Sequence, residues 1–592
     1  MLGSRLTSRW VAFSAAIFVV VAIYVYPSIK ARVQLGDSPL PAMFAPDLSM
    51  YLNLSQIRSA GDGRIWNPYY RIPVPTDGAG YLKFRLAPGL FGRLNKLLGS
   101  RTWLSLLLWN AFWWTSLAIA SVWLFARFLP LQSTPVVMMG VGLTLVFNFG
   151  VLKSLLLAWI HLPSLAGFTP LSLPFMRAFI PVIPCVAMLV YLGLQMEALR
   201  RRSVIPWAVM ATLQLFALAV FPYATVMMVG ITGVSVLRQM MRLGVHETWR
   251  IPLVYAIACA LLDLAFLWNG SVGYYDNRSA AIHFQPQLLP HLIGGNWLLI
   301  VAMTVAVIFA KPLSFDVKWP LAGLGFTNAL LMLGDAIVPS TRLLLSHHAA
   351  HFVHLTLATL AVFVMAAALK ALPDRRYVGL VPVFLLALIT LNGVLLSRGN
   401  YRGFIQQNED MVQISRLQPV FNSGDSELLI ARSTTVDDSC GWLALLSTSP
   451  VLFCTDAEVM LTPQQNRDIH RFRQAIYLYL TGESRDRLRQ TLAAGDTSNV
   501  IWRLGYWAEA ISWSGEERQQ GIQAIESDII PQLERVDNRD VEVVNFFRNF
   551  HRIVVVDTQR NSTFVPDRLA SFLKLEGQQV SNNFVLSFYT PR

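Results

Sequence analysis

Residues 44–88 read FAPDLSMYLNLSQIRSAGDGRIWNPYYRIPVPTDGAGYLKFRLAP and form a long polar loop between two apolar segments near the N-terminus. Membrane proteins usually join their spans with short connections, so about 75 residues between the first two spans, 28–102, need a reason. Long loops are more often functional or disordered. The aromatic content of this loop argues against disorder, so we expect the chemistry of the protein here.

The composition of the chain is that of a polytopic membrane protein. Of its 592 residues, 54% are hydrophobic and only 14% are charged, which excludes an ordinary soluble protein. The net charge of +13 is explained by the Lys and Arg bias of cytoplasmic loops, so we expect no nucleic-acid partner. Residues 10–27 follow Arg5 and Arg9 with no small-residue cleavage site after them, which predicts an uncleaved signal anchor.

Eleven apolar runs are long enough to cross about 30 Å of hydrocarbon at about 1.5 Å per residue. They are residues 10–27, 103–129, 135–160, 178–197, 204–220, 223–237, 250–268, 296–312, 319–337, 351–370 and 377–396. The least certain stretch is 204–237, because Phe221-Pro222-Tyr223 must then make a tight hairpin. A single broken helix there would give ten spans and move the C-terminus to the other side.

The charge distribution predicts a cytoplasmic N-terminus. Basic residues gather in the loops and span ends on one side: Arg5, Arg9, Arg127, Arg200, Arg201, Arg202, Arg238, Arg242, Arg250, Lys311, Lys318, Lys370, Arg375 and Arg376. The short loops on the other side carry only Arg177, Arg278 and Arg342. This asymmetry favours eleven spans, and it places loop 28–102 and the C-terminal region outside the cytoplasm.

The composition becomes that of a soluble protein after Arg398, which predicts a transmembrane domain of 1–397 and a periplasmic α/β domain of 398–592. Strands are predicted in 427–432, 442–454, 552–557 and 583–590, and helices in 463–481, 483–494, 498–512 and 515–534. A disulfide is predicted between Cys440 and Cys454 in this oxidising compartment. Cys185 and Cys259 lie in spans and should stay reduced.

Asp47 is the candidate catalytic residue of the first loop. Pro46-Asp47 begins a helical pattern in which Asp47, Tyr51 and Arg58 fall on one face. A carboxylate just outside a membrane can act as a general base and take the proton of an acceptor hydroxyl, with Tyr51 and Arg58 as substrate-binding residues. The alternative is that Asp47 is only a helix N-cap. Asp62 and Asp77 lie in Gly-flanked turn sequences.

Taken together, these features resemble the C-type (GT-C) superfamily of polyprenyl-phosphate-sugar glycosyltransferases: a first span, a long external loop opening with a helix near an Asp, about eleven spans and an external α/β domain. At the residue level the resemblance rests on Pro46–Tyr51 (PDLSMY), and the chain lacks the WWD motif of oligosaccharyltransferases. It implies a protein of a bacterial inner membrane and inverting sugar transfer from an undecaprenyl-phosphate donor to a saccharide or lipid acceptor, with Asp47 as the catalytic loop aspartate.

A polyprenyl-phosphate donor requires cations near the outer membrane boundary. Lys153, Arg177 and Arg342 are the candidates, although each could be an ordinary interfacial residue. His347 and His351 follow Arg342 and share a helical face with His354; they could bind phosphate or acceptor, bind a metal, or have no chemical role. No metal set with ligand spacing is readable, so no cofactor is predicted and a divalent metal is left open.

Two further features bear on substrate and mechanism. The predicted external loop 269–295 contains Tyr275 and Asp276, a combination of ring and carboxylate that suits a carbohydrate as well as ordinary loop packing. Asp263 lies in a span and is predicted to pair with a polar group such as Gln214. Such an acid also keeps open a transporter or flippase of a lipid-linked saccharide, and a non-catalytic assembly protein of the same fold is a third reading.

Overall fold

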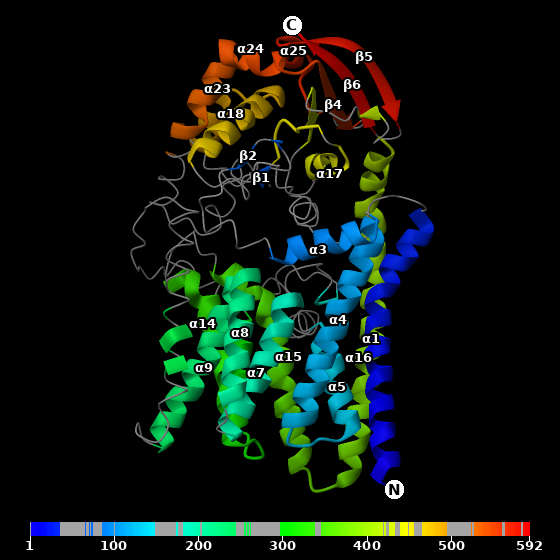
Figure 1. The fold of residues 1–592 in the computed structure, drawn as a ribbon, viewed down its shortest axis with the longest axis vertical. Coiled ribbons are helices and arrows are strands. Elements are labelled where there is room, and N and C mark those ends of the chain that lie inside the picture. Colours follow the sequence, from blue (N-terminus) through cyan, green and yellow to red (C-terminus); the bar gives the residue numbers. More distant parts are fainter. Residues whose placement is uncertain are drawn as a thin grey trace.

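The protein is a helical bundle that carries a smaller α/β domain at one end, as the computed structural model shows (Figure 1). The described residues are 2–35, 65–66, 70–71, 73–74, 86–99, 101–148, 173–175, 182–201, 204–243, 254–255, 257–259, 261, 296–337, 345–417, 420–421, 426–432, 439–447, 449–454, 464–493, 523, 526–558, 563–581 and 584–592. The N-terminus lies at the far end of the bundle and the C-terminus in the domain. We call these ends of the bundle the N-terminal end and the domain end.

The bundle is built from α1 (Leu2–Leu35), α4 (Thr102–Phe128), α5 (Thr134–Leu145), α7 (Val182–Arg201), α8 (Val204–Val220), α9 (Pro222–Leu243), α13 (Trp297–Phe309), α14 (Phe315–Ile337), α15 (Leu345–Ala371) and α16 (Arg375–Arg416). Within the described residues, six helices are long and apolar enough to cross a membrane, and three shorter apolar helices accompany them. The protein is therefore a multi-pass membrane protein. α8 and α9 are separate helices that meet at Phe221-Pro222, where the sequence allowed a hairpin between two spans or a break in one, and proline begins a helix well.

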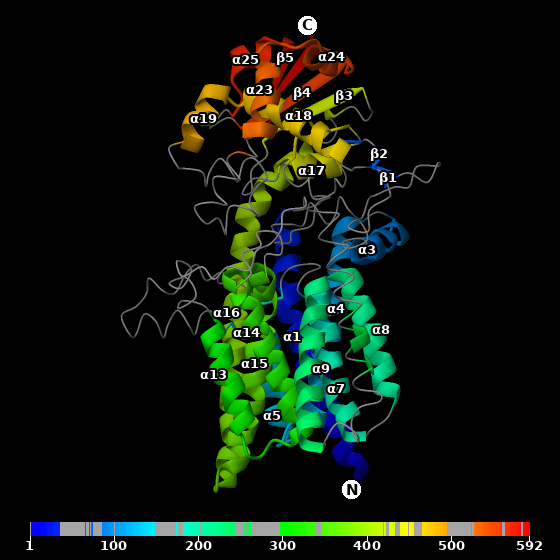
Figure 2. The same cartoon turned by 90° about the vertical axis from the view of Figure 1, so that its left-hand side faces the viewer.

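Small residues allow α9 and α14 to approach closely. A Cβ added to Gly323 of α14 would lie 2.7 Å from the backbone Cα of Ile231 in α9, and one added to Gly230 would overlap the Thr327 side chain. Helices in lipid associate through such close packing, because the lipid tails are as apolar as the helix surfaces. α9 and α14 therefore pack directly against each other, on the side of the bundle opposite α1 (Figure 1, Figure 2).

Charged contacts join the helices at the N-terminal end of the bundle. Arg127 lies 3.3 Å from Glu197, and Arg200 forms an ion pair with Asp316. The guanidinium groups of two neighbouring arginines lie over aromatic rings of α14, each 4.7 Å from the ring centre: Arg238 over Trp319 and Arg242 over Phe315. The basic residues of this set that the structure describes therefore lie at the end opposite the C-terminal domain.

Helix α16 connects the bundle to the C-terminal domain. Its 42 residues extend about 63 Å at the usual rise, about twice the thickness of the hydrocarbon core. It continues without a break past residues 397 and 398, where the composition changes. At the domain end, α3 (Leu86–Leu97) lies across the bundle helices and exposes Leu90 and Leu97 (Figure 1).

The domain contains a four-stranded sheet of order β3-β4-β6-β5. The strands are β3 (Glu427–Ala431), β4 (Arg552–Thr558), β5 (Leu573–Ser581) and β6 (Phe584–Pro591). β3 and β4 are parallel, and the other pairs are antiparallel. Glu427, buried at the start of β3, pairs with Arg552 at 3.3 Å, and Arg552 also donates to the carbonyl of Val420 after α16. This pair joins the sheet to the end of the connecting helix.

The domain helices are α17 (Ser439–Leu446), α18 (Gln464–Leu480), α19 (Arg485–Ala493), α23 (Ile530–Asp537), α24 (Val541–Arg548) and α25 (Pro566–Ala570). The predicted strand at 442–454 is wrong over its first half, because α17 occupies Ser439–Leu446 and only Val451 makes a β-bridge, to Leu429. A short apolar run fits a buried helix as well as a strand, so periodicity could not decide. The predicted Cys440–Cys454 disulfide is confirmed, and Cys185 and Cys259 take part in no disulfide.

Candidate functional site

Most residues that the sequence singled out lie outside the described part of the chain. These are Asp47, Tyr51, Arg58, Asp62, Asp77, Lys153, Arg177, Asp263, Tyr275, Asp276 and Arg342. Of the predicted substrate-binding residues, the structure places His351, and His347 through its backbone in α15. The candidate site is therefore built from the described residues at the domain end of the bundle and in the C-terminal domain.

The first loop leaves and re-enters the bundle at the domain end. It follows α1, whose last turns pack on α16: the Lys30 ammonium lies 4.2 Å from the centre of the Tyr401 ring. The loop ends at α3, where the Asn95 amide oxygen accepts a hydrogen bond from Ser105 of α4 at 2.9 Å. Between these ends the described residues include a short hairpin, in which β1 (Ile65–Trp66) pairs antiparallel with β2 (Pro73–Val74).

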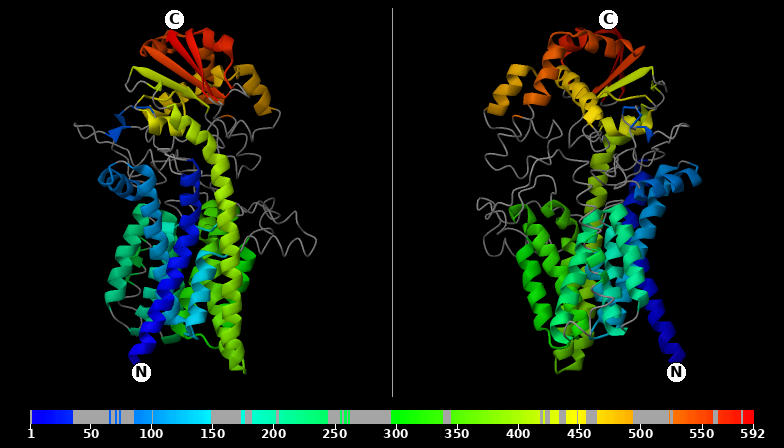
Figure 3. Two further views of the ribbon diagram at one scale, coloured as in Figure 1. Left: turned by 90° about the vertical axis from the view of Figure 1, so that its right-hand side faces the viewer. Right: turned by 60° about the vertical axis from the view of Figure 1, so that its left-hand side comes forward.

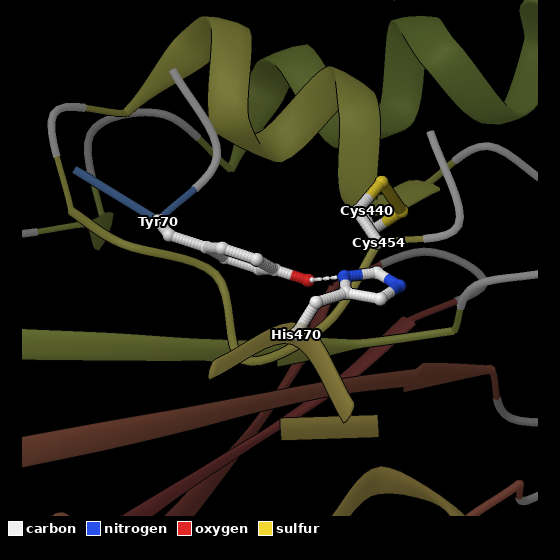
Figure 4. Close-up of a disulfide and its surroundings, with 4 residues drawn as sticks. All are labelled: Tyr70, Cys440, Cys454 and His470. Carbon is white, nitrogen blue, oxygen red and sulfur yellow. Dashed lines mark hydrogen bonds between the residues drawn. A yellow bond between two sulfur atoms is a disulfide. The ribbon is translucent and has the colours of Figure 1, made fainter. Parts of the chain in front are cut away.

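Tyr70, in the connection between β1 and β2, is inserted into the C-terminal domain. Its side chain is 1% exposed, and its hydroxyl lies 2.6 Å from Nδ1 of His470 in α18 (Figure 4). The Arg473 guanidinium lies over the phenol ring of Tyr70, 4.5 Å from the ring centre. The first loop and the domain therefore share a buried contact between residues 400 positions apart in the sequence.

Arg71 makes a second contact with the same domain. Its Nη2 donates to the carbonyl oxygens of Ala444 at 2.9 Å and Ser447 at 2.8 Å, at the C-terminal end of α17. Helix C-termini carry unpaired carbonyls and partial negative charge, so a guanidinium is favourable there. The backbone of Arg71 has φ = 54°, a left-handed conformation that costs a non-glycine residue about 1–2 kcal/mol.

Burial and positive charge control the titration of this contact. Burial, together with the charges of Arg471 and Arg473, holds the pKa of His470 well below its ordinary value, so His470 is neutral at physiological pH. Burial also lowers the pKa of Arg473 to about 10, which leaves its guanidinium charged. Neutral His470 and the Tyr70 hydroxyl can thus form one hydrogen bond with each other. The charged guanidinium of Arg473 lies over the phenol ring.

The histidines of α15 have different roles. Nε2 of His354 lies 2.8 Å from the carbonyl oxygen of Thr144 and therefore donates to it, at the end of α5 where helical carbonyls have no intrahelical partner. Tyr24 donates in the same way to the carbonyl of Leu145. His354 is thus a structural residue. His351, one turn nearer the domain, is partly exposed and lies 5.8 Å from Phe221 between ring centres.

Residues 173–175 are fixed against the same helices. Trp114 Nε1 donates to the carbonyl of Phe175 at 2.8 Å, and the Phe175 amide donates to the Tyr24 hydroxyl at 3.3 Å. The Phe175 ring also lies edge-on to His354, with ring centres 5.5 Å apart. The chain that leads to Arg177 is therefore anchored one helical turn from His351.

A polar cluster lies in the middle of the bundle. Tyr191 contacts Thr232 at 2.6 Å and Tyr255 at 3.2 Å between oxygens. Thr232 donates to Gln195, and Tyr255 donates to Gln214. The Nε2 atoms of both glutamines are buried without a hydrogen-bond partner among the described residues. The expected Asp263–Gln214 pair stays a prediction, because Asp263 lies outside those residues; the Gln214 oxygen accepts from Tyr255.

Sequence reasoning missed Tyr70, Arg71, His470 and Arg473. The signal was present in α18, because His470, Arg473 and Tyr477 share one face of that helix and all three are buried. A histidine and an arginine on a buried helix face require partners. Among the residues that the structure describes, no three His, Cys, Asp or Glu side chains gather as a metal site would require.

Comparison with known proteins gives a likeness among solved structures. No family model matches the chain, and no curated protein does. Among solved structures, the chain is similar to ArnT from Cupriavidus metallidurans, whose crystal structure contains undecaprenyl phosphate. The two chains are 12% identical, the match covers 98% of each, and the TM-score is 0.39.

Proposed function

We propose that the protein is a membrane glycosyltransferase that moves a sugar from a polyprenyl-phosphate-linked donor to an envelope glycan or lipid acceptor. The observation that carries the proposal is the position of the first loop: α1 and α3, which bound it, reach the same end of the bundle as the C-terminal domain. The described ends of the loop that holds Asp47 therefore lie at the end of the bundle where α15, the helix of His351, begins.

In the proposed reaction, Asp47 takes the proton of the acceptor hydroxyl while the hydroxyl oxygen attacks the anomeric carbon of the sugar. The bond between that carbon and the phosphate oxygen breaks, and polyprenyl phosphate leaves with the bonding electrons. A one-step displacement of this kind inverts the anomeric configuration. General-base help contributes about 10²–10⁴-fold to such a step.

The remaining predicted residues receive roles from their chemistry. Lys153, Arg177 and Arg342 would pair with the donor phosphate, and His347 and His351 would donate hydrogen bonds to it. Support comes from His351, which is partly exposed at the domain end, and from Phe175, which anchors the chain two residues before Arg177. Tyr51, Arg58, Tyr275 and Asp276 would bind the sugar and the acceptor.

The test of the proposal is Asp47→Asn, compared with Asp62→Asn and Asp77→Asn. Asparagine caps a helix about as well as aspartate, so the variant should accumulate normally and lose about 10²–10⁴-fold in turnover if Asp47 is the base. The two control variants should remain active. The envelope glycan and the amount of membrane protein are measured together, and an abundant, fully active Asp47→Asn protein would remove the base and favour a transporter or an assembly protein.

Transport of a lipid-linked saccharide is the second candidate, and the mid-bundle polar cluster favours it. Polar groups deep in a membrane protein often mark a substrate path, and Gln195 and Gln214 both present buried amide groups there. Gln214→Leu should abolish movement of a fluorescent polyprenyl-phosphate sugar across proteoliposomes if the protein is a flippase. The matched variant Thr212→Val, on the exposed face of α8, should leave this movement unchanged. A glycosyltransferase would show no such movement in either variant.

A further inference from the structure

The contact made by Tyr70 and Arg71 is specific in its chemistry. We call these two residues, with Ala444, Ser447, His470 and Arg473, the loop–domain contact. Both side chains have partners on the domain. The Tyr70 hydroxyl is hydrogen-bonded to an imidazole nitrogen and its ring lies under a guanidinium. The Arg71 guanidinium donates to two carbonyls. Charge-assisted and buried hydrogen bonds of this kind are stronger and more selective than surface contacts.

The backbone of Arg71 indicates that these contacts hold the hairpin in place. A non-glycine residue at φ = 54° is disfavoured, and such residues persist where their surroundings over-determine them. Here the guanidinium reaches both carbonyls at the end of α17 from that conformation. The side-chain contacts therefore outweigh the local backbone cost.

The disulfide joins the two halves of the surface that receives the hairpin. Cys440 lies in the first turn of α17, which receives Arg71, and Cys454 ends a segment that packs on α18. In that segment the Phe453 ring lies 5.2 Å from the His470 ring, and the Val451 carbonyl accepts from Arg473 at 2.9 Å. Figure 4 shows the disulfide beside Tyr70 and His470. The bond thus fixes the position of α17 relative to α18.

We propose that the loop–domain contact is a positioning device: the C-terminal domain holds the first loop over the domain end of the bundle, and the Cys440–Cys454 disulfide maintains the receiving surface. The loop is then fixed at three described places, its two ends in α1 and α3 and its hairpin on the domain (Figure 3). Division of a long loop into shorter segments reduces its conformational freedom. The link between this device and catalysis rests on the proposed glycosyltransferase function.

Hydrogen–deuterium exchange on the full-length protein in nanodiscs tests the contact without any assay of activity. Peptides that cover residues 65–74 should exchange at least ~10-fold faster in Tyr70→Phe, which loses the buried hydrogen bond to His470. Arg71→Lys should have a similar effect, because an ammonium cannot reproduce the two-carbonyl contact of the planar guanidinium. Arg71→Gly, which relieves the backbone and removes the guanidinium, should also exchange faster.

Matched controls come from the opposite end of the bundle. Tyr377→Phe removes a hydroxyl from a side chain that is 54% exposed, and Arg376→Lys makes the same exchange of cation at an exposed site; neither should change the hairpin peptides. Cys440→Ser with Cys454→Ser should accelerate exchange in 65–74 as Tyr70→Phe does. Where this double variant does not accumulate, reductant added to the wild-type protein provides the same comparison. Unchanged exchange in the Tyr70, Arg71 and disulfide experiments would overturn the proposal.

Turnover then tests the positioning role. The cations assigned to the donor phosphate lie in segments other than the first loop, which contributes only Tyr51 and Arg58 to binding of the sugar. Tyr70→Phe should therefore lower kcat about 10-fold and change KM for the lipid-linked donor much less. A kcat and a donor affinity that fall by the same factor would refute positioning. An unchanged kcat despite faster exchange in residues 65–74 would refute it as well. If Asp47→Asn is fully active, the glycosyltransferase proposal fails, while the exchange experiment still decides whether the loop–domain contact exists.

Discussion

At the scale of single residues, His470 shows why the sequence alone was insufficient. Its helix was predicted at 463–481, and α18 (Gln464–Leu480) confirms it. Its partner Tyr70 lies 400 residues earlier, and no local pattern relates the two. Likewise, His354 was grouped with candidate phosphate ligands because of its spacing, whereas its partner is the Thr144 carbonyl at the end of another helix. Spacing identifies a shared face and cannot identify what that face meets.

His470 also leads to a prediction about pH. Burial and the neighbouring arginines lower its pKa in the folded protein, whereas in the unfolded chain it titrates near pH ~6.5. Below that pH the unfolded state binds a proton that the folded state does not, so stability falls as pH falls, by up to ~1.4 kcal/mol per pH unit. Above pH ~6.5 the contribution of His470 is constant.

The measurement is thermal unfolding of the domain between pH 5 and 8, for the wild type and for His470→Gln, which keeps a hydrogen-bonding group opposite Tyr70 and does not titrate. The stability of the wild type relative to the variant should decline only on the acid side of pH ~6.5. A constant difference across the whole range would show that His470 titrates normally in the folded protein.

At the scale of elements, the sequence predicted helices and strands correctly where an apolar run was long or was bounded by proline or turn residues. The boundary at Phe221-Pro222 separates α8 from α9 as expected, and strand β4 covers the predicted 552–557. Strand β5 was missed, because LKLEGQQVS is largely polar and has an irregularity between Leu575 and Gly577. Its hydrogen bonds come from pairing with β6, which is a long-range property that local propensity does not contain.

Two glycines of the bundle differ in the space that an added methyl group would have. Gly323→Ala places a methyl group against the backbone of Ile231, where no side chain can rotate away, so it should destabilise the α9–α14 pair by about 1–3 kcal/mol. Gly379→Ala is the matched control, because a Cβ at Gly379 of α16 meets nothing within 4 Å. The fraction of protein that remains monodisperse after heating in detergent should fall for Gly323→Ala and stay unchanged for Gly379→Ala. An equal fraction in the two variants would mean that α9 and α14 lie farther apart.

At the scale of the whole molecule, two independent features favour the same orientation. The basic residues of the short loops and span ends, among them Arg127, Arg200, Arg238 and Arg242, lie at the N-terminal end, and such residues mark the cytoplasmic side. The disulfide lies at the other end, in the C-terminal domain, and disulfides persist outside the cytoplasm. The first feature was readable from the sequence. The meeting of the first loop with the domain was not, because it depends on how α16 carries the domain over the bundle.

Reporter fusions at the two ends of α16 test this orientation. A fusion after Arg416, the last residue of α16, should give active alkaline phosphatase, which folds only where disulfides form, and no fluorescence from a cytoplasmic reporter. A fusion at Pro373, between α15 and α16, should give the reverse. Activity of the cytoplasmic reporter after Arg416 would place the first loop, the domain and its disulfide in the cytoplasm. Sugar transfer at the external face would then be excluded, because Asp47 would face the wrong compartment.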